Sequence, residues 1–118
     1  MLSNSELFSL EGKISVVIGG GGHICSALAY GFASAGSKVV VADLRLEKAQ
    51  IVASVIESEY GVSTLAVEAD ASSKKSLEQL LHQTTSVFGK VDVLVNGAGI
   101  NSPKSFLEIT EGEWHEVV

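Results

Sequence analysis

The chain has 118 residues, 46% of them hydrophobic, a formal net charge of −6 and one proline, which is typical of a folded domain rather than a disordered chain. Eight basic residues against 14 acidic ones argue against a nucleic-acid partner. No run reaches the roughly 20 apolar residues that cross a bilayer, so no membrane partner is expected. The single cysteine, Cys25, forms no intrachain disulfide, and the first ten residues do not resemble a secretory signal. We therefore expect a soluble, cytoplasmic protein.

Four short, valine-rich segments predict β-strands. Their apolar residues follow one another directly instead of alternating with polar ones, which is typical of parallel strands covered on both faces. The predicted strands are Ile14–Ile18, Lys38–Ala42, Thr64–Ala69 and Val91–Val95.

Three segments between these strands have helical spacing, and each is followed by a glycine that would end a helix. The first apolar stripe is expected to comprise Ile24, Ala27, Leu28, Phe32 and Ala35, before Gly36; the second Val52, Val55, Ile56 and Tyr60, before Gly61; the third Leu77, Leu80, Leu81, Val87 and Phe88, before Gly89. His82 is expected to face solvent. A capping box at 110–113 predicts a fourth helix that runs to the end of the chain without a stop signal.

Alternation of strand and helix predicts an α/β fold, a Rossmann-type doubly wound parallel sheet with strand order 3-2-1-4. Residues 1–118 are then one domain, which we interpret as incomplete. The strand order reverses between the first and the fourth strand, where ligands bind in such sheets beyond the carboxyl ends of the strands. The turn at Gly19–Gly22 and the segment Asn96–Gly99 would both lie there.

The glycine turn predicts a phosphate site. A strand that ends in four glycines and leads into a helix leaves N–H groups at the helix N-terminus, where the dipole favours an anion. The closest fit to G-x-G-x-x-G is Gly20-x-Gly22-x-x-Cys25, with cysteine in the third position. A merely flexible turn is the alternative.

Asp43 supports the dinucleotide interpretation. It follows the second predicted strand and lies 21 residues after Gly22, close to the roughly 20 expected for a carboxylate that binds the adenosine ribose. The alternative is an aspartate of the turn or N-cap before the next helix. A carboxylate at this position disfavours a 2′-phosphate, although Arg45 would reduce the repulsion, so we expect NAD rather than NADP.

With these residues assembled, the chain resembles the short-chain dehydrogenase/reductase family over nearly its whole length. The family's T-G-x-x-x-G-x-G motif falls on Ile18 to Cys25, with Ile18, His23 and Cys25 departing from it. Its N-N-A-G motif falls on Asn96–Gly99, with the second Asn replaced by Gly97. Asp70 matches the aspartate that bonds the adenine amino group in the family.

The glycine turn and the resemblance together assign a set of residues to the dinucleotide: Gly19, Gly21, Gly22, His23, Ile24, Asp43, Leu44, Asp70, Ala71, Asn96, Gly97 and Ala98. Two of the departures leave alternatives open. His23 either attracts the phosphate as a cation or is a solvent-facing bystander. Cys25 is either a buried small residue or a reactive thiol at a helix N-terminus.

The resemblance implies hydride transfer between a nicotinamide and an alcohol or carbonyl, in the branch that acts on sugar acids and polyols. The family's catalytic Tyr-x-x-x-Lys is absent, because Ser34 follows Tyr30 and Thr64 follows Tyr60 at that spacing. We therefore expect the cofactor-binding part of an NAD-dependent oxidoreductase, with no catalytic residue and no metal ligand in this chain.

The resemblance further implies a homo-oligomer for the full-length protein. An exposed edge on the fourth strand would favour self-association of the 118-residue chain. Two alternatives remain, a non-catalytic nucleotide-binding or interaction module and a Rossmann-like methyltransferase.

Overall fold

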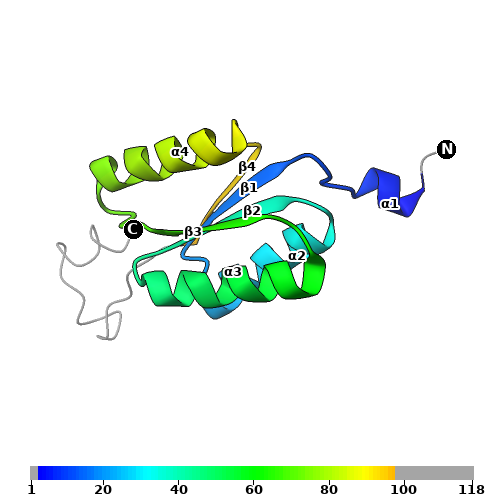
Figure 1. Cartoon of the computed structure of the whole chain (residues 1–118), viewed down its shortest axis with the longest axis horizontal. Helices are drawn as coiled ribbons and strands as arrows, with labels where there is room; N and C mark the ends of the chain where they lie inside the picture. Colours follow the sequence, from blue (N-terminus) through cyan, green and yellow to red (C-terminus); the bar gives the residue numbers. More distant parts are fainter. Residues whose placement is uncertain (1–2, 98–118) are drawn as a thin grey trace, which may run out of the picture.

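Residues 3–97, the part that the computed structural model describes, form a parallel sheet with helices on both faces (Figure 1). The strands are β1 (Ile14–Ile18), β2 (Lys38–Asp43), β3 (Thr64–Glu68) and β4 (Val93–Asn96), and the helices are α1 (Asn4–Leu7), α2 (His23–Ser34), α3 (Leu46–Tyr60) and α4 (Lys74–Phe88). The strands lie side by side in the order β3-β2-β1-β4, and all three pairings are parallel. The predicted α/β fold with strand order 3-2-1-4 is therefore confirmed.

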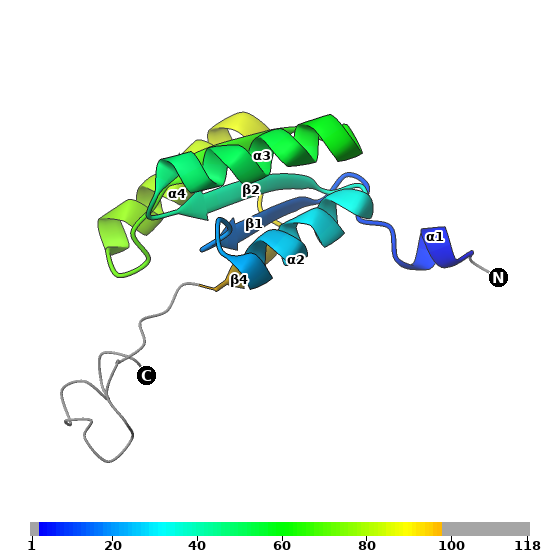
Figure 2. The same ribbon diagram turned by 90° about the horizontal axis from the view of Figure 1, so that it is seen from below.

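The sheet is covered by α2 and α3 on one face and by α4 on the other, as Figures 1 and 2 show. Alternate residues of β1 serve the two layers: Val17 packs with α2 and α3, whereas Val16 and Ile18 lie in the layer beneath α4. In β2 the four residues 39–42 are completely buried. Burial on both faces explains why β1 and β2 are apolar without interruption.

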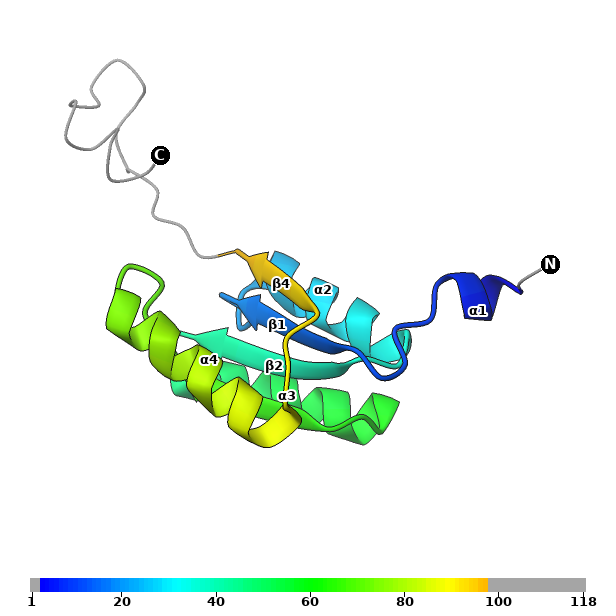
Figure 3. The same ribbon diagram turned by 90° about the horizontal axis from the view of Figure 1, so that it is seen from above.

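The fourth strand does not share this environment. It begins at Val93, two residues later than predicted, and its outward-facing Leu94 is 62% exposed. Figure 3 shows why: α4 lies over the β2 and β3 side of the sheet, and β4 lies at the opposite edge. The prediction that all four strands are covered on both faces is wrong for β4, because β4 is the edge strand of the part of the sheet that the structure describes.

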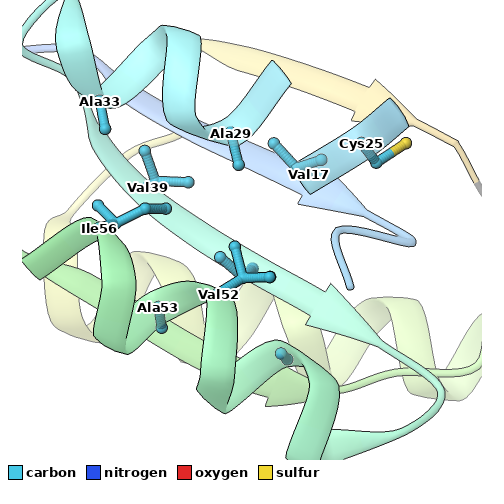
Figure 4. Close-up of a cluster of buried hydrophobic side chains, with 10 residues drawn as sticks. Val17, Cys25, Ala29, Ala33, Val39, Val52, Ala53 and Ile56 are labelled. Carbon is cyan, nitrogen blue, oxygen red and sulfur yellow. The ribbon is translucent and has the colours of Figure 1, made fainter. Parts of the chain in front are cut away.

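The buried face of α2 also differs from the predicted one. Its buried residues are Cys25, Ala29 and Ala33, one helical turn apart, whereas Ile24 is 78% exposed and Leu28 41% (Figure 4). Small side chains let the helix axis approach the sheet closely, and the larger apolar side chains lie at its flanks. The predicted stripe is wrong for Ile24 and Leu28, because apolarity alone does not distinguish these two faces of the helix, whereas Phe32 is partly buried against the core.

The other two helices follow the prediction in part. Val52 and Ile56 of α3 are buried as expected, together with Ala49 and Ala53, which extend the same face. On α4 the expected Leu80 is buried, but Leu81 and Val87 are more than half exposed; Thr84 takes a buried position instead and donates its hydroxyl to the Leu80 carbonyl.

The predicted helix ends are confirmed. Gly61 and Gly89 follow α3 and α4 with φ of 68° and 84°, the left-handed conformation that glycine adopts without steric cost. His82 is exposed, also as predicted. The fourth helix, predicted from the capping box at 110–113, lies outside the described residues.

Asp92 connects the beginnings of β1 and β4, and it predicts a pH dependence of stability. Its Oδ2 accepts the Ile14 N–H at 2.9 Å and lies 3.0 Å from the Lys90 Nζ, and these interactions hold the pKa of Asp92 below its ordinary 3.8. A carboxyl group whose pKa is lowered by folding stabilises the fold above its unfolded-state pKa. That contribution disappears as the pH falls through the lower, folded-state pKa.

We expect Asp92→Asn to lower the melting temperature at neutral pH, with a smaller difference from the unchanged chain at a pH well below 3.8. Thermal unfolding followed by circular dichroism at both pH values measures this. The control is Lys90→Met, which keeps the bond to Ile14 and should cost less. An equal difference at both pH values would contradict the assigned role of the carboxylate.

Candidate functional site

The glycine turn joins β1 to α2 and is held against β2. The N–H groups of Gly19 and Gly20 both donate to the Ala42 carbonyl, at 2.7 and 3.0 Å, and the Gly22 N–H donates to the Gly19 carbonyl at 3.1 Å. These amides are therefore satisfied within the turn. The first N–H groups of α2, which begins at His23, have no partner within a helix, and Gly22 provides no side-chain cap for them.

Two of the glycines are required by close packing. A Cβ on Gly20 would lie 2.7 Å from the Val41 Cγ1 and 3.0 Å from the Val17 carbonyl oxygen. A Cβ on Gly21 would lie 2.6 Å from the Lys48 Cβ and 2.8 Å from the Asp43 Oδ2. The turn therefore lies directly against the end of β2 and the beginning of α3, so it is not merely flexible.

Asp43 ends β2 and faces this turn. Its Oδ2 accepts the Gly21 N–H at 3.0 Å, and its Oδ1 accepts the Arg45 N–H at 2.9 Å. The bond from Arg45 makes Asp43 a turn residue, as one of the two alternatives to ribose binding predicted. The N-cap alternative is wrong, because Arg45 is the N-cap of α3. An ionised carboxylate has about four acceptor positions, so these two bonds leave capacity for hydroxyl donors.

Asp70 lies in the loop between β3 and α4. The Ser72 hydroxyl and the Ser72 N–H both donate to its Oδ1, at 2.6 and 2.9 Å, and they lower the pKa of the Asp70 carboxyl group. The Asp70 N–H donates to the Ser76 Oγ at 2.8 Å. The neighbouring Ala71 is half-buried, and Leu44, which follows Asp43, is 65% exposed.

The end of β4 lies beside the end of β1. Asn96 pairs with Ile18 in the sheet register, and the Gly97 N–H donates to the Ile18 carbonyl at 2.9 Å. Gly97 also lies so close to Cys25 that a Cβ there would overlap the Cys25 Sγ. The expectation that the glycine turn and the segment after the fourth strand lie together is confirmed for Asn96 and Gly97, and Ala98 lies outside the described residues.

His23 and Cys25, the two departures from the glycine motif, differ in burial. His23 and Ile24 are exposed at the start of α2, and Cys25 is 8% exposed, so it is the buried small residue of the two alternatives. The assigned residues that the structure describes gather at the carboxyl ends of β1, β2, β3 and β4. Among residues 3–97 there is no cluster of three or more side chains able to hold a metal ion, and no helix there is long and apolar enough to cross a membrane.

Three residues near the site were not assigned from the sequence. Gly20 was left out although it fits the glycine motif; its N–H bonds the Ala42 carbonyl, and a Cβ there would meet Val41. Lys48, in the first turn of α3, lies against Gly21. The Ser72 hydroxyl donates to Asp70, two residues before it. Gly20 had a signal in the glycine motif, and Ser72 had one in Asp-x-Ser, a common pattern of side-chain-stabilised turns; Lys48 had none.

Comparison with known proteins identifies the family. The short chain dehydrogenase family model matches residues 13–118. The chain belongs to the short-chain dehydrogenase family. This match decides against the methyltransferase alternative, and it confirms the resemblance on which the site residues were assigned.

Relatives in the short-chain dehydrogenase family include an uncharacterized oxidoreductase of Thermotoga maritima, 38% identical over 109 residues, or 92% of this chain and 42% of that protein. A short-chain type dehydrogenase/reductase of Mycobacterium marinum superposes with a TM-score of 0.88 and 29% identity, covering 98% of this chain and 47% of its own. L-sorbose reductase of Gluconobacter frateurii, solved with NADPH and L-sorbose, superposes with a TM-score of 0.82 and 28% identity. The match covers 91% of this chain and 41% of the reductase chain. The chain thus spans less than half the length of these relatives.

Proposed function

We propose that the chain binds the adenosine and pyrophosphate of NAD(H), as the cofactor-binding part of an NAD-dependent oxidoreductase that interconverts an alcohol and a carbonyl compound. The observation that carries the proposal is the position of Asp43, whose carboxylate reaches the glycine turn through the Gly21 N–H. A carboxylate and a helix N-terminus so close together match the ribose hydroxyls and the neighbouring diphosphate of an adenosine diphosphate.

The residues around the glycine turn fit the adenosine and pyrophosphate of NAD(H). Ribose hydroxyls are donors, and the remaining acceptor positions of Asp43 suit them. The N–H groups of His23 and Ile24, at the uncapped start of α2, suit the pyrophosphate. Leu44 offers an exposed apolar side chain for the adenine, and Asp70, with Ala71 beside it, an acceptor for the adenine amino group.

The choice of NAD over NADP also depends on Asp43. Two like charges about 4 Å apart repel by about 4 kcal/mol at an effective dielectric constant of about 20, so a 2′-phosphate beside this carboxylate is disfavoured. Arg45 and Lys48 lie nearby and reduce this penalty, so NADPH should bind more weakly rather than not at all. One relative, L-sorbose reductase, was solved with NADPH.

A bound nicotinamide supplies or accepts a hydride. The contribution of this chain's own residues is to bind and orient: Asp43 holds the ribose, the start of α2 holds the pyrophosphate, and Asn96 and Gly97 line the approach to the nicotinamide. Ala98 is proposed to bind the cofactor with them. Since Tyr-x-x-x-Lys is absent from these 118 residues, we expect the chain by itself to be inactive. The similarity to L-sorbose reductase supports a sugar acid or polyol as the substrate of the full-length parent, and we expect that parent to be a cytoplasmic homo-oligomer.

Isothermal titration of the chain with NADH, NADPH and S-adenosylmethionine tests the proposal. We expect NADH to bind with one molecule per chain, NADPH to bind more weakly, and S-adenosylmethionine to give no heat of binding. Tighter binding of NADPH would contradict the choice of cofactor. Absence of binding by both dinucleotides would contradict the function.

A further inference from the structure

The backbone conformation of Gly97 does not require a glycine. Its φ lies outside the left-handed region, unlike that of Gly19, so other residues could adopt its conformation. What excludes a side chain is space: a Cβ on Gly97 would overlap the Cys25 Sγ and lie 3.2 Å from the Ile18 carbonyl oxygen. Cys25 therefore fills the volume that a side chain at position 97 would need.

Cys25 is well placed for this contact. It lies in the first turn of α2, 8% exposed, in a cluster with Val17 and Ala29. Figure 4 shows its sulfur pointing away from that cluster, toward the end of β4. The thiol thus separates the start of α2 from the end of β4, the two segments assigned to the pyrophosphate and to the approach to the nicotinamide.

Both residues depart from the motifs of the family that the chain resembles, and they depart in opposite directions. The glycine motif has a glycine where Cys25 stands, and the N-N-A-G motif has an asparagine where Gly97 stands. One position has gained a side chain and the other has lost one, and the structure shows that the two positions touch. The two departures are therefore one change in packing.

We propose that Cys25 is a positioning residue for the dinucleotide site, which acts by supporting Gly97 and so sets the spacing between α2 and the end of β4. This inference rests on the proposed function. At the end of β4, beside the pairing of Asn96 with Ile18, Gly97 donates its N–H to the Ile18 carbonyl and contacts this thiol. The effect should fall on the pyrophosphate and nicotinamide and spare the adenosine end at Asp43.

The test is a double-mutant cycle with Gly97→Ala, Cys25→Ala and both together, titrated with NADH and with AMP. Relief of the overlap would shift the end of β4 away from α2, so Gly97→Ala should weaken NADH binding by about tenfold. AMP binding, which depends on Asp43, should not change. The double variant should recover NADH affinity, because alanine at position 25 removes the overlapping sulfur. Additive losses, or an equal loss for AMP, would overturn the proposal.

Amide hydrogen exchange tests the contact without a ligand. In Cys25→Ala the Gly97 N–H should exchange faster, whereas the Gly19 N–H, bonded to Ala42, should be unchanged. Unchanged exchange at Gly97 would overturn the supporting role. If Gly97→Ala does not fold, recovery of folding in the double variant supports the pairing and its failure overturns it. If the unchanged chain does not bind NADH, the proposed function fails and the cofactor role of Cys25 with it, while the exchange rates still decide the contact.

Discussion

Asp43→Ala is expected to weaken NADH binding by ten- to a hundredfold. Hydrogen bonds to an ionised group contribute about 1.5–3 kcal/mol each, and a tenfold change in affinity corresponds to about 1.4 kcal/mol. The substitution also removes the acceptor of the Gly21 N–H, so the glycine turn loses a support at the same time. Isothermal titration of the variant with NADH and NADPH measures the effect.

The ratio of the two affinities separates ribose binding from a general loosening of the turn. Removing the carboxylate removes the repulsion of a 2′-phosphate, so NADPH should lose much less affinity than NADH. Glu47→Ala is the matched control, because Glu47 is an exposed acidic residue in the first turn of α3 and its removal changes the net charge equally. Equal losses for both dinucleotides would mean that Asp43 acts only on the turn.

Gly20→Ala is expected to lower the free energy of unfolding by about 1–3 kcal/mol, the usual cost of overpacking. Its Cβ would lie 2.7 Å from the Val41 Cγ1 and 3.0 Å from the Val17 carbonyl oxygen, and a backbone oxygen of the central sheet cannot move aside cheaply. Relief of the overlap would shift the turn away from Ala42, so NADH affinity should fall as well.

Gly22→Ala, two residues along the same turn, is the control. A Cβ on Gly22 would lie 3.4 Å from the Gly19 carbonyl oxygen, an ordinary contact, and the φ of Gly22 is −80°. We expect it to cost about 0.5–1 kcal/mol, because alanine is a poorer N-cap than glycine although its Cβ meets no close neighbour. Urea unfolding of both variants measures the contrast. Equal destabilisation would show that the turn tolerates no side chain anywhere, and that Val41 does not determine the effect.

The strand order and the place of the site followed from local features of the sequence. Uninterrupted valine-rich runs mark strands buried on both faces, and β1 and β2 show that burial. The distance from the glycine turn to Asp43 reflects one helix and one strand of ordinary length, and in the structure the carboxylate and the turn meet through Gly21. Parallel strands bring their carboxyl ends to one edge whatever the details of packing.

Side-chain orientation was less predictable. Ile24 and Leu28 looked like the core face of α2, yet the alanines and Cys25 face the sheet. A helix that packs closely on a sheet excludes bulky side chains from the line of closest approach, and hydropathy carries no information about that distance. The same limit applies to Leu94, whose exposure depends on how far α4 extends across the sheet.

The sequence by itself determined the fold class, the order of the strands and which loops meet, because burial periodicity and chain connectivity are local properties. The tertiary structure alone decided why particular residues stand where they do: Gly20 against Val41, Gly97 against Cys25, and Asp43 against Gly21. These are contacts between residues 21 or more positions apart, and their distances depend on the packing of whole elements rather than on any neighbouring residue.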